Sequence, residues 1–368
     1  MEGADIMDQL SKARQEINRI DREMARLFTE RMAAAAEVAA YKKEKCLPIF
    51  DVQREEQVLR QNTELIDEKE LRPYYRKYIT GLMNLSKQYQ KALMNVGTVA
   101  YQGIPGAYSY LAMKALFPTN AEKAYETFEE VCKAVLEDEA AFGILPFENS
   151  YAGEVGENMD LLYRYDLHVV NMYELKINHN LLGIKGTRLS NIRRVYSKDQ
   201  ALAQCRRFLD SHGLELIPYR NTAAAAKMVS ETQDKTLAAI ASRETAELYG
   251  LDVIASDIST SAENTTRFAV ISKQDLGPGD RMSLFFTVDH KTGSLAGVMQ
   301  VIAKHGFNME CIRSKPLHNI PWQYYFYVEL CGDVVSEKAQ ALIAQLQQSC
   351  REVKLVGSYY KGLQDERK

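Results

Sequence analysis

Apolar residues near the N-terminus recur at intervals of three and four positions, the spacing of one helix face. Nothing interrupts this spacing before Leu47-Pro48, and its members are Ile6, Leu10, Ala13, Ile17, Ile20, Met24, Leu27 and Phe28. A helix from about Asp5 to Lys43 would be about 58 Å long. A domain of this size cannot cover such a helix by folding back on itself, so we expect a partner chain to cover the rest. Two shorter helices are predicted after it, at about Asp51–Asp67 and Lys69–Met94.

Short apolar runs alternate with helical stretches between residues 97 and 273, which is an α/β pattern. Strands are expected at 98–103, 142–147, 193–197, 214–219, 237–242 and 267–272, and helices at Thr127–Asp138, Asp199–His212 and Ala223–Glu231. Two long extended stretches, Leu167–Ile177 and Asp252–Thr260, are suited to carrying the chain between two lobes. We therefore expect two α/β subdomains with a cleft between them.

The Gly/Pro-rich segment Asp275–Asp280 reads as a linker. Beyond it the pattern predicts strand, helix, two strands, helix and strand, at Met282–Val288, Ser294–His305, Phe307–Pro316, Trp322–Cys331, Ser336–Cys350 and Glu352–Tyr360. That βαββαβ order is ferredoxin-like. The expected fold class is therefore multidomain: an all-α part at 1–94, a two-lobed α/β part at 97–273 and a ferredoxin-like part at 281–368.

Composition adds mainly exclusions. Hydrophobic residues make up 46% of the chain and charged residues 26%, an ordinary mix for a globular protein. The formal net charge of -3 gives no reason to expect nucleic acid or a membrane surface as partner. No apolar run reaches the roughly 20 residues of a membrane span, and no signal peptide is recognisable. The 6 cysteines are scattered, which argues against a disulfide framework or zinc site and suits the reducing cytoplasm.

Charged and amide side chains share helix faces in the N-terminal part. Arg31 and Lys42 are eleven residues apart, which places them about 20° from the same face and about 16 Å apart along the axis. Arg14 lies earlier on the same helix, and Asp51/Glu55 and Ser86/Gln90 are i,i+4 pairs. Such a set in one pocket would suit a small dicarboxylate. Taken singly, each charge is more simply a solvated surface residue.

Polar residues also follow buried strands of the central part. In L-P-F-E-N-S, helix or turn capping explains Asn149 or Ser150 but not Glu148, which is attached directly to an apolar strand. In V-Y-S-K-D-Q, Ser197 ends another strand, and Gln204 follows on the next helix. Side chains at the carboxyl ends of α/β strands are site candidates.

The stretch N-T-T-R-F opens the last strand of the central part. Alternation along a strand puts Thr266 on the face of Phe268, and Thr265 and Arg267 on the other face. Thr266 is therefore expected to point inward, toward the side on which the other polar segments converge.

Residues 5–94 resemble the all-helical chorismate mutases through R-Q-E-I-N-R-I-D, T-E-R-M-A-A-A-A-E-V-A-A-Y-K, P-I-F-D-V-Q-R-E-E and S-K-Q-Y-Q. The resemblance implies an intertwined dimer that rearranges chorismate to prephenate, with Arg14 supplied by one chain and the other site residues by its partner. Arg14 and Arg31 would clamp the two carboxylates, and Lys42 and Gln90 would bind the ether oxygen. Asp51 and Glu55 would hold the ring hydroxyl, and Ser86 would contact the substrate.

Residues 97–273 resemble the prephenate dehydratases through Y-Q-G-I-P-G-A-Y-S, the extended L-P-F-E-N-S segment, V-Y-S-K-D-Q-A-L-A-Q-C, A-I-A-S-R-E-T-A-E-L-Y-G-L and N-T-T-R-F. The implied fold is two-lobed and periplasmic-binding-protein-like, and the reaction removes carbon dioxide and water from prephenate. Thr266 is expected to donate a hydrogen bond to the leaving hydroxyl. The expected substrate-orienting residues are Glu148, Asn149, Ser150, Ser197, Gln204 and Arg267.

Residues 281–368 resemble the ACT domains of dehydratases through H-K-T-G-S-L-A-G-V-M and C-I-R-S-K-P. The resemblance implies a phenylalanine site formed by Gly293, Ser294, Leu295, Ala296, Arg313 and Ser314. Where the family has E-S-R-P, this chain has Arg313 and Lys315 in R-S-K-P. Phenylalanine is expected to inhibit the dehydratase.

The three resemblances in this order point to the bifunctional chorismate mutase–prephenate dehydratases of phenylalanine biosynthesis. They imply chorismate and prephenate as substrates, phenylalanine as effector, a cytoplasmic homodimer or tetramer, and neither cofactor nor metal. An arogenate dehydratase, which loses the same groups from the transaminated substrate, remains an alternative. So does a non-catalytic amino-acid sensor, which ultraviolet assays of chorismate loss and phenylpyruvate formation would distinguish from the enzyme.

Overall fold

The computed structural model describes residues 2–44, 52–94, 97–261, 263–274, 277–317, 320 and 322–361. The chain forms two compact units, Met1–Val96 and Gly97–Lys368. Within the described residues, no helix combines the length and apolar character that a membrane crossing requires.

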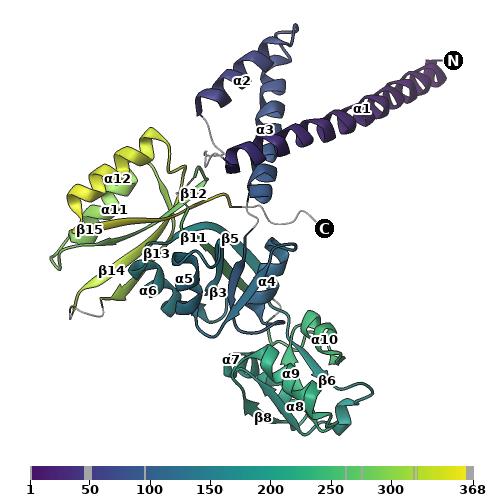
Figure 1. Ribbon diagram of the computed structural model, residues 1–368, viewed down its shortest axis with the longest axis vertical. Coiled ribbons are helices and arrows are strands. Elements are labelled where there is room, and N and C mark those ends of the chain that lie inside the picture. Colours follow the sequence, from purple (N-terminus) through teal and green to yellow (C-terminus); the bar gives the residue numbers. More distant parts are fainter. Residues whose placement is uncertain are drawn as a thin grey trace. The chain divides into compact units, whose positions relative to one another are not determined.

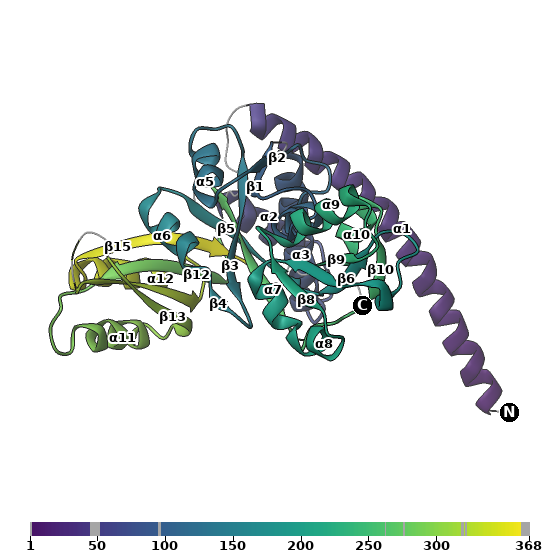
Figure 2. The same cartoon turned by 90° about the horizontal axis from the view of Figure 1, so that it is seen from below.

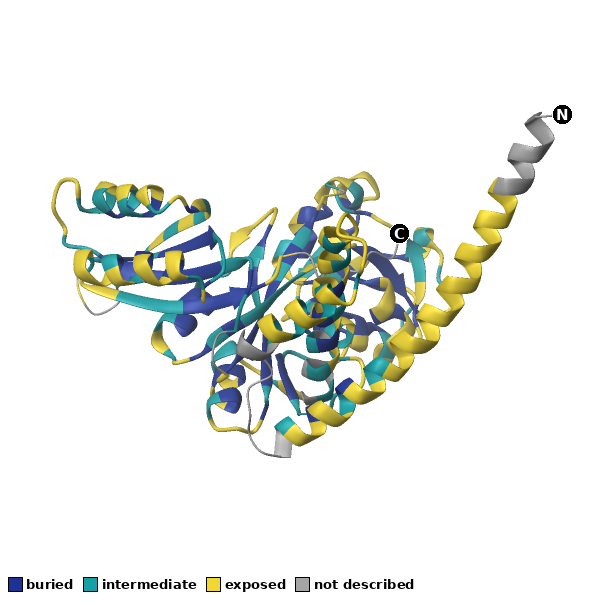
Figure 3. Cartoon of the chain, turned by 90° about the horizontal axis from the view of Figure 1, so that it is seen from above, coloured by how far each residue is buried: buried dark blue, intermediate teal, exposed yellow. Residues whose placement is uncertain are grey.

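The N-terminal unit is all-helical, as expected. Its described helices are α1 (Glu2–Glu44), α2 (Val52–Glu64) and α3 (Arg72–Met94). Both α1 and α2 contact α3, and the few buried side chains include Ala35, Ala39, Ile79 and Met83. Most of α1 is exposed (Figure 3), including its apolar residues Leu10, Ile17, Ile20, Met24, Leu27 and Phe28.

The second unit begins with an α/β lobe, here called the first lobe (Figure 1). Its sheet has the strand order β5-β11-β3-β1-β2, with β4 paired to β3. Helices α5 and α6 pack on one face of this sheet, and α4 packs on the other. The elements are β1 (Val99–Gln102), α4 (Tyr108–Leu116), β2 (Glu122–Tyr125), α5 (Phe128–Leu136), β3 (Phe142–Asn149), β4 (Gly153–Glu154), α6 (Gly156–Arg164), β5 (His168–Lys176) and β11 (Thr265–Ser272).

The second lobe is a smaller α/β sandwich inserted between β5 and β11. Its sheet order is β10-β6-β9-β7-β8, with α7 and α8 on one face and α9 and α10 on the other. The elements are β6 (Asn180–Gly183), β7 (Arg194–Ser197), α7 (Asp199–Gln204), α8 (Arg206–Ser211), β8 (Glu215–Pro218), α9 (Thr222–Thr232), β9 (Leu237–Ala241), α10 (Arg243–Tyr249) and β10 (Asp252–Ala255).

Two details of the second lobe differ from the sequence prediction. The helix expected at Asp199–His212 is divided at Cys205, where the backbone leaves helical geometry at φ -102° and ψ 5°. Of the two stretches expected to link the lobes, Leu167–Ile177 is almost entirely strand β5 of the first lobe, whereas Asp252–Thr260 is strand only at Asp252–Ala255, β10 of the second lobe. The chain crosses just beyond these strands, and the two crossings are joined by the bonds Ile177 N–H to Asn264 O (2.7 Å) and Ile258 N–H to His179 O (2.9 Å).

The C-terminal part has the expected βαββαβ order. Its elements are β12 (Arg281–Thr287), α11 (Ser294–Lys304), β13 (Asn308–Pro316), β14 (Tyr324–Cys331), α12 (Glu337–Ser349) and β15 (Glu352–Tyr359). Helices α11 and α12 cover one face of these strands (Figure 2). The other face joins the core of the first lobe: Phe285, Tyr325 and Tyr327 cluster with Leu145 and Phe147.

The sheet itself continues from the C-terminal part into the first lobe. Strand β15 pairs with β5 in parallel where Gly357 lies opposite Val169, which completes a 10-stranded sheet. Two lysines of the C-terminal part also hold helix α6. Lys315 Nζ contacts Gly156 O (2.7 Å) and Asp160 near its N-terminus, and Lys354 Nζ contacts the carbonyls of Leu162 (2.9 Å), Tyr163 (3.2 Å) and Tyr165 at its C-terminal end.

Candidate functional site

A cavity of about 470 Å³ lies between the two lobes of the second unit and is called the cleft cavity below. The first lobe contributes Tyr108 and Ser109 from α4, Pro146 and Asn149 from β3, and Thr266 and Phe268 from β11. The second lobe contributes Lys198, Gln200 and Gln204 around α7, and Asn221 and Thr222 at the start of α9. Of the predicted dehydratase residues, the structure brings Asn149, Gln204 and Thr266 together here.

Asn149 and Thr266 face each other across the pairing of β3 and β11. The Asn149 Nδ2 group donates to Thr266 Oγ1 at 2.9 Å and to Asn264 Oδ1 at 2.7 Å. Because the Thr266 oxygen already accepts this bond, its hydroxyl hydrogen remains available for a group in the cleft cavity. The arrangement makes Thr266 a hydrogen-bond donor toward whatever the cavity holds.

A bulge in β3 decides which side chains reach the cavity. Arg267 lies opposite Glu148 but Phe268 lies opposite Pro146, so Phe147 is one extra residue in this strand. An extra residue reverses the alternation beyond it. Asn149 therefore joins Pro146 on the cavity side, and Glu148 lies opposite Arg267.

Glu148 and Arg267, both expected to orient substrate, are not among the residues that line the cleft cavity. Arg313 Nη2 contacts Glu148 Oε1, and Arg267 Nη1 lies 3.6 Å from Glu148 Oε2. Arg267 Nη2 also lies 3.0 Å from Oε1 of Glu329, whose side chain is only 1% exposed. Burial of Arg267 acts to lower its pKa, but the charge and hydrogen bond of Glu329, together with Tyr359 and Tyr327, outweigh burial and raise the pKa overall. This charged cluster of Glu148, Arg267, Arg313 and Glu329 joins β3 and β11 to β13 and β14. Direct substrate contact by Glu148 or Arg267 is thus not supported by the geometry.

Ser150 and Ser197 also serve the local backbone. The Ser150 hydroxyl donates to Glu263 O (2.9 Å) and accepts from Thr265 N (3.0 Å). Ser197 is fully buried and donates to Ile240 O at 2.8 Å, which joins β7 to the end of β9. Neither residue lines the cleft cavity, so a direct substrate contact is not supported for them.

Among the polar residues of the cleft cavity that the sequence reasoning missed, Tyr108, His179 and Asn264 are linked to one another through Gln204. The Tyr108 Oη atom is 3.1 Å from His179 Nδ1, and His179 Nε2 is 2.8 Å from Gln204 Oε1. Burial lowers the pKa of His179, while its bond with Gln204 acts in the opposite direction. Asn264 lies in the same N-T-T-R-F motif as Thr266, a signal that was available. His179 follows a strand without any motif of its own.

The polar residues of the N-terminal unit converge partly. Arg31 on α1 donates to Leu82 O (3.3 Å) and to Ser86 Oγ on α3, and burial lowers the pKa of Arg31. Gln90 lies one turn beyond Ser86, and its buried Oε1 has no hydrogen-bond partner among the described residues. Glu55 on α2 pairs with Lys87 at 2.8 Å.

The remaining predicted residues of this unit are Lys42, Arg14 and Asp51. Lys42 is half-buried on α1. Arg14 is exposed, and seventeen residues of helix separate it from Arg31, about 26 Å along the axis. One chain therefore does not bring Arg14 to Arg31. Asp51 lies outside the described residues.

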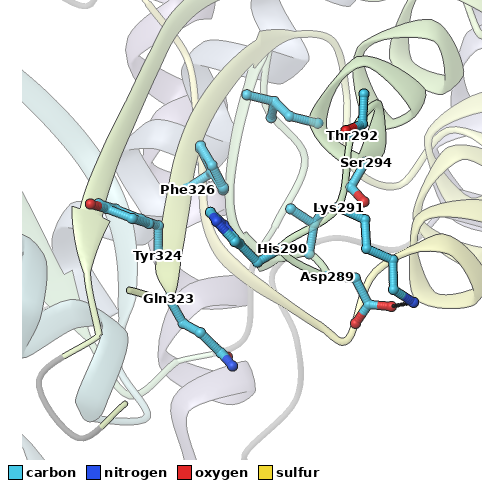
Figure 4. Close-up of a pocket in the computed structure, with 10 residues that line it drawn as sticks. Asp289, His290, Lys291, Thr292, Ser294, Gln323, Tyr324 and Phe326 are labelled. Atoms are coloured by element: carbon cyan, nitrogen blue, oxygen red, sulfur yellow. Dashed lines mark hydrogen bonds and ion pairs between the residues drawn. The ribbon is translucent and has the colours of Figure 1, made fainter. Parts of the chain in front are cut away.

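A third set of predicted residues surrounds a pocket of about 400 Å³ in the C-terminal part (Figure 4). Ser294 and Leu295 line it, together with His290, Thr292 and Tyr324 among others. Gly293 precedes α11 with φ +86°, a left-handed conformation that favours glycine, while Ala296 is the third residue of that helix. Arg313 and Ser314 do not line this pocket: Arg313 points to Glu148, and Ser314 is exposed on β13.

Comparison with known proteins places these sites in context. The family model for prephenate dehydratase matches residues 99–276, and the model for chorismate mutase type II matches residues 13–91. A bifunctional chorismate mutase/prephenate dehydratase of Aquifex aeolicus (strain VF5) is 32% identical over 98% of this chain and 100% of its own length. Arogenate dehydratase/prephenate dehydratase 2 of Arabidopsis thaliana is 34% identical over 71% of this chain and 72% of its own.

A solved structure shares the fold of the second unit. The prephenate dehydratase of Arthrobacter aurescens, determined in complex with L-Phe, superposes with a TM-score of 0.67 at 24% identity. The match covers 72% of this chain and 90% of that one.

Proposed function

The chain belongs to the bifunctional chorismate mutase/prephenate dehydratase family, and we propose a place in the chain for each of its activities. It converts chorismate to prephenate and prephenate to phenylpyruvate in phenylalanine biosynthesis, with phenylalanine as feedback inhibitor. We assign the mutase to residues 1–94, the dehydratase to 97–273 and phenylalanine sensing, by an ACT domain, to 281–368.

The dehydratase assignment is carried by one observation, the bond from the Asn149 amide to Thr266 Oγ1. In the reaction, the bond from the ring to the departing carboxylate breaks, its electron pair completes the aromatic ring, and hydroxide leaves from the opposite carbon. The Thr266 hydroxyl donates a hydrogen bond to that oxygen as negative charge grows on it. A donor already oriented before reaction stabilises such charge without reorganisation. The carboxylate leaves as carbon dioxide, and the departing hydroxide takes a proton from the solvent and leaves as water.

Several groups around the cleft cavity can hold an anionic substrate, and two carboxylates, Glu154 and Glu157, also line it. The first residues of α4, α6 and α9 contribute to its lining through Ser109, Gly156 and Thr222. Helix N-termini present unpaired N–H groups and a partial positive charge, and Lys198 adds a cation. Prephenate carries two carboxylates, so these groups supply its anchors.

The mutase reaction needs no covalent step, so positioning and charge must supply the catalysis. Arg31, held by Ser86, is placed to bind a carboxylate, and Gln90, whose buried Oε1 has no hydrogen-bond partner among the described residues, lies one turn further along α3. Arg14 is too far along α1 to join them in one chain. We therefore assign Arg14 to the site of a second copy, in a homodimer formed through the exposed apolar residues of α1.

Phenylalanine binding is assigned to the pocket at the start of α11. The Ser294 N–H group donates to Lys291 O at 3.2 Å, which leaves the N–H groups of Leu295 and Ala296 in the first turn for a ligand. The charged cluster offers a route to the active site, because Glu148 precedes Asn149 and Arg267 follows Thr266. Movement of β13 or β14 would pull on Arg313 or Glu329 and so on the residues next to the reacting groups.

A second candidate substrate is arogenate, in which an ammonium group replaces the keto oxygen of prephenate. Two carboxylates, Glu154 and Glu157, line the cleft cavity, and either would attract an ammonium group. Comparison of kcat/KM for prephenate and arogenate separates the two substrates.

Thr266→Ala tests the assignment in the full chain. We expect dehydration to fall about 100-fold or more, as for loss of one preorganised donor, with mutase turnover unchanged. Arg31→Ala should lower mutase turnover and leave dehydration unchanged. Thr265→Ala, one residue away on the other face of β11, is the matched control. Chorismate loss and phenylpyruvate formation are followed by ultraviolet absorbance; normal dehydration by Thr266→Ala would remove this hydroxyl from the mechanism.

A further inference from the structure

The orientation of one amide in the cleft cavity is fixed by the backbone. Asn149 Oδ1 accepts from the N–H groups of Tyr151 (3.0 Å) and Ala152 (2.9 Å). A backbone N–H group can only donate, so the oxygen of this amide must face the two residues. Its nitrogen therefore faces Thr266 and Asn264.

The orientation of the Asn149 amide fixes the orientations of the next two amides in the series. The Asn149 nitrogen donates to Asn264 at 2.7 Å, so the atom of Asn264 that receives it is Oδ1. Asn264 then presents Nδ2 to Gln204 at 3.0 Å, so the Gln204 atom is Oε1. Asn264 and Gln204 are 2% and 5% exposed, which leaves little room for water to substitute for either partner.

His179 is the last residue in this series of hydrogen bonds. Its Nε2 lies 2.8 Å from the same Gln204 oxygen and must therefore carry a hydrogen. In a neutral imidazole Nδ1 is then the acceptor, and Tyr108 Oη lies 3.1 Å from it. Burial lowers the pKa of His179 and raises that of Tyr108, which favours the neutral ring and the protonated phenol. The tautomer of His179 thus follows from two backbone N–H groups.

This series of bonds determines which group of Gln204 is left without a partner. Its oxygen accepts from both His179 and Asn264, while its buried Nε2 has no hydrogen-bond partner among the described residues. A buried amide N–H group without a hydrogen-bond partner is destabilising. Gln204 lines the cleft cavity, where an oxygen of a bound molecule would accept a hydrogen bond from this nitrogen.

We propose that His179 is a positioning residue of the dehydratase: its Nε2–H group holds the Gln204 oxygen, so that the Gln204 nitrogen donates to an oxygen of the substrate. This rests on the dehydratase activity proposed above and assigns the substrate partner a chemistry, a carboxylate or keto oxygen that accepts a hydrogen bond. His179 does not touch the substrate through this bond; it acts through Gln204.

The test compares two replacements of His179 in the full chain with prephenate as substrate. His179→Leu removes the donor, and we expect about a tenfold rise in KM with a smaller change in kcat, since the lost interaction is a binding contact. His179→Gln places an amide nitrogen near the position of Nε2 and should restore most of the loss. His212→Leu, on the exposed end of α8, is the matched control and should leave dehydration unchanged.

A double-mutant cycle separates positioning from general damage to the fold. In a Gln204→Met background, His179→Leu should change KM by less than twofold, because the group through which it acts is gone. Multiplicative effects of the two substitutions would overturn the proposal, as would no rescue by His179→Gln in a protein with unchanged thermal unfolding. Absence of dehydration in the unmodified protein would instead reject the proposed function itself.

Discussion

Asn149 is the residue on which the geometry of the dehydratase site depends. Its oxygen satisfies two backbone N–H groups, and its nitrogen donates to the Thr266 hydroxyl, the proposed donor to the substrate, and to Asn264. Every polar atom of the side chain thus has an assigned direction. A change of this amide alters the hydroxyl and the Gln204–His179 pair together.

Asn149→Asp is expected to lower dehydration about 100-fold with no effect on mutase turnover. The carboxylate has no N–H to donate, so the Thr266 hydroxyl would turn its hydrogen toward residue 149 and away from the substrate. Initial rates on prephenate and chorismate measure the two activities. Asn308→Asp, exposed at the start of β13, makes the same chemical change far from the cavity and should affect neither rate. Dehydration by Asn149→Asp within a few-fold of normal would contradict this orientation of Thr266.

Alternation along the strand correctly predicted which face of β11 carries Thr266 and which carries Arg267. Glu148 was expected at the site because it directly follows an apolar strand, but the extra residue Phe147 in β3 places it opposite Arg267, and it does not line the cleft cavity. A bulge depends on the pairing with a distant strand, which the local pattern of a single strand does not contain. His179 was missed for a related reason: its partners Tyr108 and Gln204 are 71 and 25 residues away in the chain.

At the scale of single elements, α1 was the most predictable part of the molecule. The regular spacing of three and four gave a helix within a few residues of the observed bounds, Glu2–Glu44. Its apolar residues are exposed in one chain, as expected for a helix that a partner covers. Helix α1 thus carries both the proposed dimer contact and, in Arg14, a proposed part of the partner's active site.

Leu27→Glu is expected to weaken the dimer and lower mutase turnover about 100-fold or more, because an unpaired charge would have to be buried in the interface. Dehydration should be unchanged. Sedimentation velocity measures the association, and chorismate loss measures the mutase. Gln15→Glu adds the same charge on the opposite face of α1 and should leave both intact. A Leu27→Glu protein with full mutase activity and unaltered association would rule out this face as the interface.

On the scale of the whole molecule, the C-terminal part is built into the dehydratase. Strand β12 begins at Arg281, where a separate C-terminal part was expected to start, yet Phe285, Tyr325 and Tyr327 pack in the same core as Leu145 and Phe147. The apolar pattern of a strand indicates which of its faces are buried. Both faces of β12 are apolar, and the pattern does not identify the first lobe as the partner of the second face. The shared core therefore emerged only from the structure.

Phe285→Ala is expected to lower the midpoint of thermal inactivation of dehydration by about 10 °C. Removal of a fully buried phenylalanine side chain costs about 3–5 kcal/mol, and each kcal/mol shifts the midpoint by about 2–4 °C in a unit of this size. Mutase activity in the same preparation is the internal control, since it belongs to the other unit. An unshifted midpoint for dehydration would show that the C-terminal part unfolds independently of the lobes.

Helix α6 connects the C-terminal part to the wall of the cleft cavity. Lys315 holds its first turn through Gly156 O, and Lys354 holds its last carbonyls. A helix of 9 residues is a stiff rod about 13 Å long. Its first residues, Gly156 and Glu157, form part of the cavity wall. The C-terminal strands therefore hold the helix at both ends. The positive charge of Lys354 lies at the negative end of the helix dipole, and the opposite end of the dipole faces the cleft cavity. A tilt of those strands would move the wall and its electric field together.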